Sequence, residues 1–339
     1  MPAVSVIIPT YNRAEFLRLA ITSVLNQTFQ DFEIIVVDDA SEDHTHEVVS
    51  DFSDKRIKYI RHEANTRVSA ARNTGVLSAS GDYIAFLDDD DEWLPGKLQI
   101  QVTLLEDSTS TFGGVYTGCV RIDRPTGQIS QLVVPKRRGN IYNDLLKSNF
   151  IVTSTVLLRR KCFDRVGLFD ESIEFWEDYD IWIRVSKEFH FECVPESLVK
   201  YWFHGNQLST NIGVLIRALE AQIRMYGGSF SLHKKYFSNR YLSLAIFYCY
   251  AGNMGKAREA YLKAIKIYPF TIKVYFYFSL ASLGEKNFKK VVRAKEALTA
   301  MLQRFSPFRR LRVKNVEQRG PRSRRRPLSA IIELFRNKR

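Results

Sequence analysis

Four consecutive aspartates, Asp88 to Asp91, form the most unusual run in this chain of 339 residues. Carboxylates this close repel one another and raise one another's pKa unless a cation or hydrogen-bond donors compensate. A solvated acidic turn would account for the run. A calcium loop starting at Asp88 would not, because its sixth and twelfth positions hold Trp93 and Gln99 instead of Gly and Glu. Oxygen ligands in this pattern suit Mn²⁺ or Mg²⁺ shared with a substrate diphosphate.

A second acidic segment, WEDYD at residues 176–180, combines carboxylates with aromatic rings. One acid at the start of a helix would simply complement the positive end of the helix dipole. Here several acids alternate with rings: Glu174, Glu177, Asp178 and Asp180 with Phe175, Trp176 and Trp182. Rings stack on the apolar face of a pyranose, and carboxylates accept hydrogen bonds from its hydroxyls. The segment therefore indicates a sugar site.

Polar residues also follow two other apolar runs. The run VSVII is followed by Pro9, Thr10, Tyr11 and Asn12, and the run EIIVV by Asp38 and Asp39. Ligands of open α/β sheets bind at the carboxyl ends of the strands, so these residues and the aspartate run are expected to share one rim. No GxGxxG follows the first run and no GxxxxGK[ST] occurs. Side chains and a metal, not a glycine-rich loop, would therefore hold a nucleotide.

The elements that must position these residues are β-branched runs that alternate with helical patterns. Strands are predicted at 4–8, 33–37, 57–60 and 83–87, and helices at 13–25, up to 49, 68–77 and 96–106. This alternation predicts an α/β fold with a mostly parallel sheet flanked by helices. Further on, the pattern predicts strands at 115–120 and 154–160 with a loop at 124–139 between them, a helix at 177–188, two strand-like runs, and helices after about 210.

The helical region has the spacing of one tetratricopeptide unit of about 34 residues. Its positions hold Tyr241, Leu244, Ala245, Tyr248, Ala257, Tyr261, Ala264 and Pro269, with Gly252 and Gly255 at the turn. An ordinary helical hairpin would fit equally well. A single repeat cannot bury its own faces, so the unit is expected to pack on the sheet domain, on a partner copy or on a membrane-facing neighbour. The predicted division is a sheet domain at 1–208, a helical region at 209–305 and a basic tail at 306–339.

The net charge of +13 is concentrated near the C-terminal end. From Lys286 onward 18 lysines and arginines face 3 acidic residues, whereas the preceding part has 32 basic and 34 acidic side chains. Cations beside the apolar stretch 328–335 favour an anionic membrane surface over a nucleic acid, and a solvated tail is the simpler alternative. Four scattered cysteines, the lack of a signal-peptide pattern and the lack of a long apolar run predict a cytoplasmic protein, peripheral to the inner face of the membrane.

Five motifs together resemble glycosyltransferase family 2, the inverting enzymes of the nucleotide-sugar-binding GT-A fold. They are VSVIIPTYNR, EIIVVDDAS, VSAARNTG, GDYIAFLDDDDEWLPGKL and WEDYDIWIR, in the order and roughly at the spacing of the family over residues 3–208. The resemblance implies a GT-A catalytic domain followed by helices. It also implies a nucleotide-sugar donor, uridine-linked by family habit, and a glycan or lipid-linked acceptor.

The resemblance also implies a role for individual residues. Nucleotide-sugar binding is implied for the turn Pro9, Thr10, Tyr11 and Asn12 and for Asp39, Arg72, Asp88 and Asp89, with Arg72 approaching the nucleotide. Metal binding is implied for Asp90 with Asp88, and His204 after the last strand has either a metal or diphosphate role or a merely structural one. Asp178 is implied as the catalytic base, with Glu177 and Trp176 at the acceptor.

Two other functions compete with this one. A catalytically inactive scaffold would use the helical region to bind a partner, but the presence of Asp88, Asp90 and Asp178 argues against it. A nucleotidyltransferase would share the sheet and the metal. It would, however, normally carry a glycine-rich basic loop after the first strand, where this chain has PTYNRAEF. The predicted function is therefore an inverting, metal-dependent glycosyltransferase that acts in cell-envelope or extracellular polysaccharide synthesis.

Overall fold

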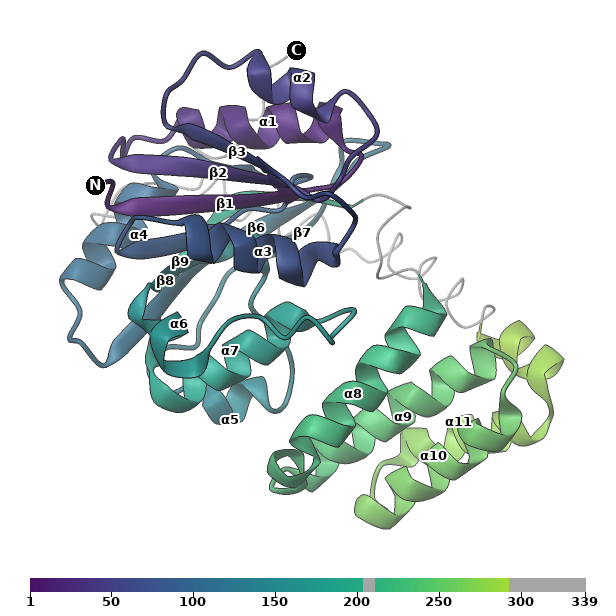
Figure 1. Cartoon of the computed structure of the whole chain (residues 1–339). Coiled ribbons are helices and arrows are strands. Elements are labelled where there is room, and N and C mark those ends of the chain that lie inside the picture. Colours follow the sequence, from purple (N-terminus) through teal and green to yellow (C-terminus); the bar gives the residue numbers. More distant parts are fainter. Residues whose placement is uncertain (204–210, 293–339) are drawn as a thin grey trace, which may run out of the picture.

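The computed structural model describes residues 1–203 and 211–292. A sheet flanked by helices forms the first part, and a group of helices lies beside it (Figure 1). His204 and the basic tail at 306–339 lie outside the described residues.

The sheet has nine strands in the described part of the chain, in the order β3-β2-β1-β4-β8-β6-β9-β5 with β7 paired to β6. The strands are β1 Val4–Thr10, β2 Phe32–Asp38, β3 Ile57–Arg61, β4 Tyr83–Phe86, β5 Glu92–Trp93, β6 Phe112–Asp123, β7 Ile129–Val133, β8 Val156–Arg159 and β9 His190–Phe203. Strands β3, β2, β1 and β4 run parallel, as the alternating pattern predicted.

The expectation of a mostly parallel sheet is correct only for this N-terminal half. Strand β8 runs antiparallel to both β4 and β6, β7 runs antiparallel to β6, and β5 runs antiparallel to β9. Strands β6 and β9 pair in parallel. The sheet is therefore mixed, because the second half replaces helical crossovers with connections such as the short turn between β6 and β7.

Two further expectations about strands are corrected. The segment 124–139 is not all loop, since it contains β7, whose residues are mostly exposed and so give no apolar signal. The two strand-like runs near residues 190 and 200 are one strand, β9, whose pairing with β6 shifts register on either side of Gly118. The irregularity interrupts the apolar alternation, which makes one strand look like two in the sequence.

Helices cover both faces of the sheet and bury two separate apolar clusters. The helices of this part are α1 Ala14–Leu25, α2 Thr45–Ser50, α3 Arg67–Ser78, α4 Lys97–Glu106, α5 Tyr142–Leu145, α6 Lys161–Val166 and α7 Glu177–Glu188, with a 3₁₀ turn η1 at Thr153–Thr155. Helices α3, α5, α6 and α7 pack on the face that presents Ile7 and Ile35. Helices α1, α2 and α4 pack on the opposite face, with Val6 and Ile8. Alternate residues of β1 thus enter opposite cores.

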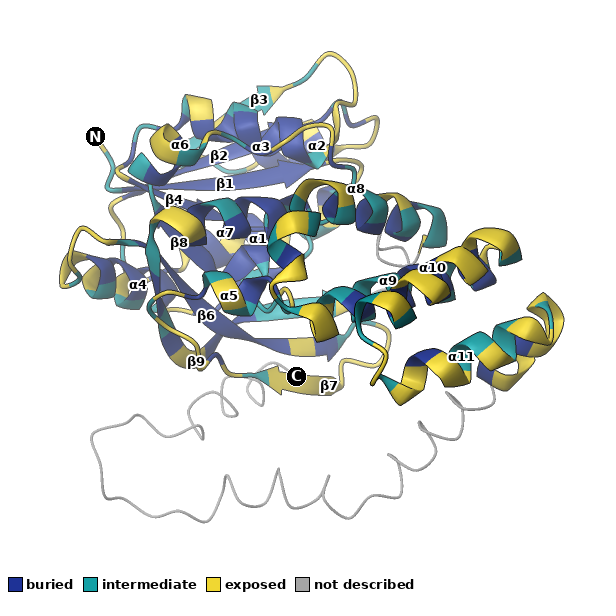
Figure 2. Cartoon of the chain, turned by 90° about the horizontal axis from the view of Figure 1, so that it is seen from below, coloured by how far each residue is buried: buried dark blue, intermediate teal, exposed yellow. Residues whose placement is uncertain are grey.

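The C-terminal region consists of helices, as predicted. They are α8 Ile212–Ser231, α9 Lys234–Tyr250, α10 Met254–Ile267 and α11 Ile272–Ser282. Their shared core includes Ala245, Tyr248 and Tyr261 from the predicted repeat, and Trp176 packs against it. Buried residues face this core, while the outer sides of α10 and α11 are largely exposed (Figure 2). Within the described residues these helices contact the sheet domain, through Trp176 and through the pair of Glu174 with Arg217. The tetratricopeptide resemblance and the domain boundaries stay predictions.

Candidate active site

The predicted nucleotide-binding residues lie at the carboxyl ends of β1, β2 and β4, on one rim of the sheet. The Thr10 hydroxyl donates to Asp89 over 2.8 Å, which joins the end of β1 to the aspartate run. The turn after β1 also contacts the loop after β2, since the Asn12 amide donates to the Ser41 hydroxyl over 2.9 Å. Pro9 and Thr10 are buried, whereas Tyr11 is 43% exposed and available to a ligand.

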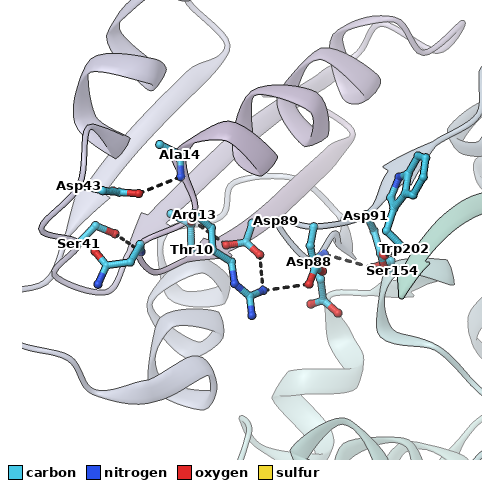
Figure 3. A network of polar contacts seen from close by, with 12 residues as sticks. Thr10, Arg13, Ala14, Ser41, Asp43, Asp88, Asp89, Asp91, Ser154 and Trp202 are labelled. Carbon is cyan, nitrogen blue, oxygen red and sulfur yellow. Dashed lines mark hydrogen bonds and ion pairs between the residues drawn. The ribbon is translucent and has the colours of Figure 1, made fainter. Parts of the chain in front are cut away.

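The four aspartates divide their carboxylates among separate partners (Figure 3). Arg13 bridges two of them, with 2.9 Å to Asp89 and 3.0 Å to Asp90. Asp91 turns away and accepts from the Ser154 hydroxyl over 2.6 Å. The Asp88 carboxylate pairs with Arg72 at 2.7 Å.

Compensation of this negative charge is incomplete. Burial, and then the charge of Asp90, raise the pKa of Asp89 to about 7 against the opposing effect of Arg13. Burial and the neighbouring carboxylates likewise raise the pKa of Asp91. The rim thus holds excess negative charge, which a cation would neutralise.

This cluster fits a divalent cation that is shared with a substrate. Asp88, Asp89 and Asp90 offer the hard oxygen ligands that Mg²⁺ and Mn²⁺ prefer. No group of three or more His, Cys, Asp or Glu within 1–203 and 211–292 forms a complete protein cage for a metal. A cation held by one or two carboxylates, with diphosphate oxygens and water completing its shell, is compatible with both observations.

Asp39 is held rigidly at the end of β2. It is 4% exposed and accepts hydrogen bonds from the Thr66 amide over 2.9 Å and from the Arg67 amide over 2.7 Å. The His62 ring lies 2.7 Å from the same carboxylate and also contacts Thr74. Burial works to raise the pKa of Asp39, but these hydrogen bonds outweigh it and lower the pKa. Asp39 is therefore an anion held in a fixed position, and its predicted contact with a nucleoside stays a prediction.

Arg72 connects the two acidic segments. Its guanidinium is 2.7 Å from Asp88 and forms a second ion pair with Glu177 at the start of α7. Burial opposes its charge, but Asp88 and Glu177 outweigh that effect and raise the pKa of Arg72. With 3% of its surface exposed, Arg72 bridges carboxylates, while its predicted approach to a nucleotide stays a prediction.

Asp178 projects from the first turn of α7. Its carboxylate accepts from the Tyr179 amide over 2.7 Å and from the Thr153 hydroxyl over 3.0 Å. Burial, and then the charge of Glu177, raise the pKa of Asp178 to about 7. A carboxylate with a pKa near neutrality is suited to accept a proton. The residue before Glu177, Trp176, adopts a left-handed backbone with φ of 65° and caps the helix.

Sequence reasoning missed the 3₁₀ turn η1 as part of the site. Thr153 donates to Asp178, while Ser154 contacts both Asp91 and the Asp88 amide. The position of η1 follows from topology: β8 is antiparallel to β4, so its beginning lies beside the end of β4. His62 was missed as well, although it directly follows β3 and so stands at the same rim. The sequence also assigned no role to Arg13, which pairs with Asp89 and Asp90.

Part of the second acidic segment is structural. Trp182 is fully buried in the sheet core, so it cannot face a sugar. Asp180 is 5% exposed and pairs with Arg184 at 2.6 Å on the same helix. Glu174 pairs with Arg217 of α8 at 2.6 Å. The helical period explains the correction, because successive residues of α7 point to different sides.

The sheet order and the acidic carboxyl-terminal rim define a GT-A type α/β fold. Staphylococcus aureus TarS 1–349 in complex with UDP-GlcNAc is similar in structure with a TM-score of 0.55 and 16% identity, covering 87% of this chain and 91% of that one. The mannosyltransferase PcManGT of Pyrobaculum calidifontis, in complex with GDP-Man and Mn²⁺, has a TM-score of 0.52 and 17% identity, covering 85% and 86%. At such identities the likeness establishes the fold alone.

Sequence comparison identifies the family. Residues 5–167 match the pattern of glycosyl transferase family 2. The Escherichia coli protein UDP-Glc:alpha-D-GlcNAc-diphosphoundecaprenol beta-1,3-glucosyltransferase WfgD is 35% identical over 212 residues, which are 61% of this chain and 80% of that protein. The chain therefore belongs to glycosyltransferase family 2. It spans only 36%, 65% and 29% of the length of three uncharacterized glycosyltransferases from Rickettsia felis, R. prowazekii and R. bellii, which are 33% to 35% identical to it.

Proposed function

We propose that this chain is an inverting, metal-dependent glycosyltransferase that moves a sugar from a nucleotide diphosphate to a hydroxyl of a glycan or lipid-linked acceptor. The observation that carries the proposal is the bridge made by Arg72. Arg72 pairs with both Asp88, which we propose on the donor side, and Glu177, which we propose on the acceptor side, and Asp178 follows Glu177 in the chain. Two acidic segments that are far apart in sequence thus form one site.

Uridine is proposed as the base of the donor. The name of the E. coli relative specifies UDP-Glc, and TarS was solved with UDP and with UDP-GlcNAc, although PcManGT was solved with GDP-Man and Mn²⁺. In this chain Asp39 would accept hydrogen bonds from the nucleoside, and Tyr11 would cover the base. A divalent cation held by Asp90 and Asp88, with His204 as a further predicted ligand, would stabilise the negative charge that develops on the leaving diphosphate.

The protein's own residues account for the transfer step. Asp178 takes the proton from an acceptor hydroxyl while that oxygen forms a bond to the anomeric carbon of the donor. The bond from the anomeric carbon to the diphosphate oxygen breaks on the opposite face, and the electron pair leaves with the diphosphate. One displacement inverts the anomeric configuration. Glu177 and Trp176 would orient the acceptor, and Thr153 would hold Asp178 in place.

The setting of the reaction is proposed from the same comparisons. The E. coli relative acts on a diphosphoundecaprenol-linked sugar by its name, which supports a lipid-linked acceptor and a role in envelope or extracellular polysaccharide synthesis. No helix within the described residues is long and apolar enough to cross a bilayer. We therefore propose that the chain works from the cytoplasm and reaches such an acceptor as a peripheral protein, with the basic tail on anionic lipid.

Calorimetric titration tests the donor site. The purified chain would be titrated with UDP, GDP and dTDP, with and without Mn²⁺, beside the variant Asp90→Ala. Tight binding of one nucleotide that disappears without Mn²⁺ and in the variant is the expected result. If the folded protein binds none of them in the presence of Mn²⁺, the inactive scaffold replaces the transferase.

A further inference from the structure

A hollow of about 420 Å³ lies where the C-terminal helices meet the start of α7. Trp176 and Tyr179 form one wall, Lys147 after α5 adds to it, and Gln222 of α8 with Arg240 of α9 forms the other. Figure 2 shows α8 and α9 on the side of the sheet domain that carries α5 and α7. The sheet domain therefore forms one wall of the hollow, and helices α8 and α9 form the other.

Two buried hydrogen-bond donors on the helical wall lack acceptors. Gln222 is 3% exposed, and its Nε2 has no partner. The Nε of Arg240 also has none, although its other nitrogens donate to the Gln222 Oε1 over 2.7 Å and to the Tyr179 hydroxyl. Buried donors without acceptors are costly, so groups left in this state point to a missing partner.

The charge of the hollow specifies that partner. Lys147 and Arg240 supply two cations, of which Lys147 pairs with Asp144 at 3.0 Å. No side chain that lines the hollow within the described residues carries a carboxylate. Burial lowers the pKa of Arg240, which measures the cost of keeping this cation away from water. A guanidinium and amide donors together suit phosphate or carboxylate oxygens. The ring of Trp176, which is partly exposed, adds apolar surface for a sugar.

The hollow adjoins the first turn of α7, which also carries Asp178. Trp176 and Tyr179 flank Asp178 in the chain and are held by the helical region: Arg240 binds the Tyr179 hydroxyl, and Trp176 packs against the helical core. A group bound in the hollow would therefore lie against the same turn of α7 as Asp178.

We propose that α8 and α9 complete the acceptor site, and that this hollow takes a sugar with a negatively charged substituent, a phosphate or a carboxylate. The inference rests on the proposed transferase function and adds the chemical class of its acceptor.

The test is binding of glucose 1-phosphate, glucuronate and glucose, each with EDTA present so that no metal holds the anions at the aspartate rim. Affinity would be measured by calorimetry, and the site located by hydrogen–deuterium exchange. Gln222→Glu removes the free donor and adds a negative charge, yet can still pair with Arg240. Asn253→Asp is the matched control, because it adds the same charge at the exposed N-cap of α10, where Asp caps as well as Asn.

At least one anionic sugar should bind about tenfold or more tightly than glucose, and Gln222→Glu should remove that preference while Asn253→Asp retains it. Protection from exchange should appear in α8, α9 and the segment around Lys147. Preference for glucose 1-phosphate would point to a diphosphate-linked acceptor, and preference for glucuronate to an acidic glycan. Equal binding of all three sugars, or protection confined to the aspartate rim, would overturn the inference. Because nucleotide titration tests the transferase separately, intact donor binding without an anionic preference overturns this inference alone.

Discussion

Replacing Asp178 by Asn should make the protein more stable while it stops sugar transfer. The folded environment raises the pKa of Asp178 to about 7, whereas an unfolded Asp titrates at about 3.9. Above neutral pH the folded protein therefore holds a carboxylate in a place that favours the acid. Three pKa units correspond to about 4 kcal/mol as an upper limit. Because Asp178 is partly exposed and water screens its charge, a gain of about 1–2 kcal/mol is expected.

Urea unfolding at two pH values checks this reasoning. A raised acid pKa lowers stability as pH climbs from about 4 to about 7, and the cost is complete above that range. Asp178→Asn should thus exceed the wild type in unfolding free energy at about pH 8. The difference should fall to about a third of that value at about pH 5 and nearly vanish below about pH 4, where the carboxyl is protonated in both the folded and the unfolded state.

Asp180→Asn is the control two residues along α7. Asp180 pairs with Arg184 and accepts from Tyr226, so loss of its charge should destabilise the protein by about 2 kcal/mol. At the higher pH, Asp178→Asn should raise the free energy of unfolding and Asp180→Asn should lower it. If Asp178→Asn is less stable than the wild type at that pH, the environment assigned to Asp178 is incorrect.

Further predictions concern the rate, the acceptor, the bridge and the packing. The value of kcat/KM for the donor should rise about tenfold per pH unit below neutrality and level off above about 7, because it reports the ionisation of Asp178 in the free enzyme. Trp176→Ala should raise the acceptor KM about tenfold and leave nucleotide affinity unchanged by calorimetry. Arg72→Lys, which cannot bridge Asp88 and Glu177 in the same way, should lower kcat about a hundredfold. Gly75→Ala places a Cβ 2.4 Å from an Ile7 methyl group and should cost about 1–3 kcal/mol in urea unfolding.

The sequence predicts the parallel half of the sheet well because three of its four strands, β1, β2 and β4, are buried on both faces. The run Val4–Thr10 is buried throughout, and so is Phe32–Asp38, which makes them continuous apolar segments. β7 escapes prediction because it is an exposed edge strand held by β6 alone, with no apolar face of its own. Pairing with a strand that is distant in the chain cannot be predicted from the local sequence.

Only part of the candidate site can likewise be predicted from the sequence. Strand ends identify Thr10, Asp39 and the aspartates, because the carboxyl ends of parallel strands must meet at one rim. Their partners come from elsewhere: Thr153 and Ser154 reach the rim only because β8 reverses direction beside β4. Helices α8 and α9, which pack beside α7, lie outside the matched family segment, so no family motif predicts them.

Arg72 explains how the aspartate run and α7 can tolerate so much negative charge in one place. Its single cation is shared by Asp88 and Glu177, and it also opposes the rise in the pKa of Asp178. Because Asp88 and Asp178 both lie near Arg72, binding of a donor with its cation would also affect Asp178. A cation bound at Asp88 and Asp90 would offset the charge of Asp88, which raises the pKa of Asp178 in the structure. Donor binding would then favour the ionised base, so proton removal from the acceptor is linked electrostatically to the presence of a donor.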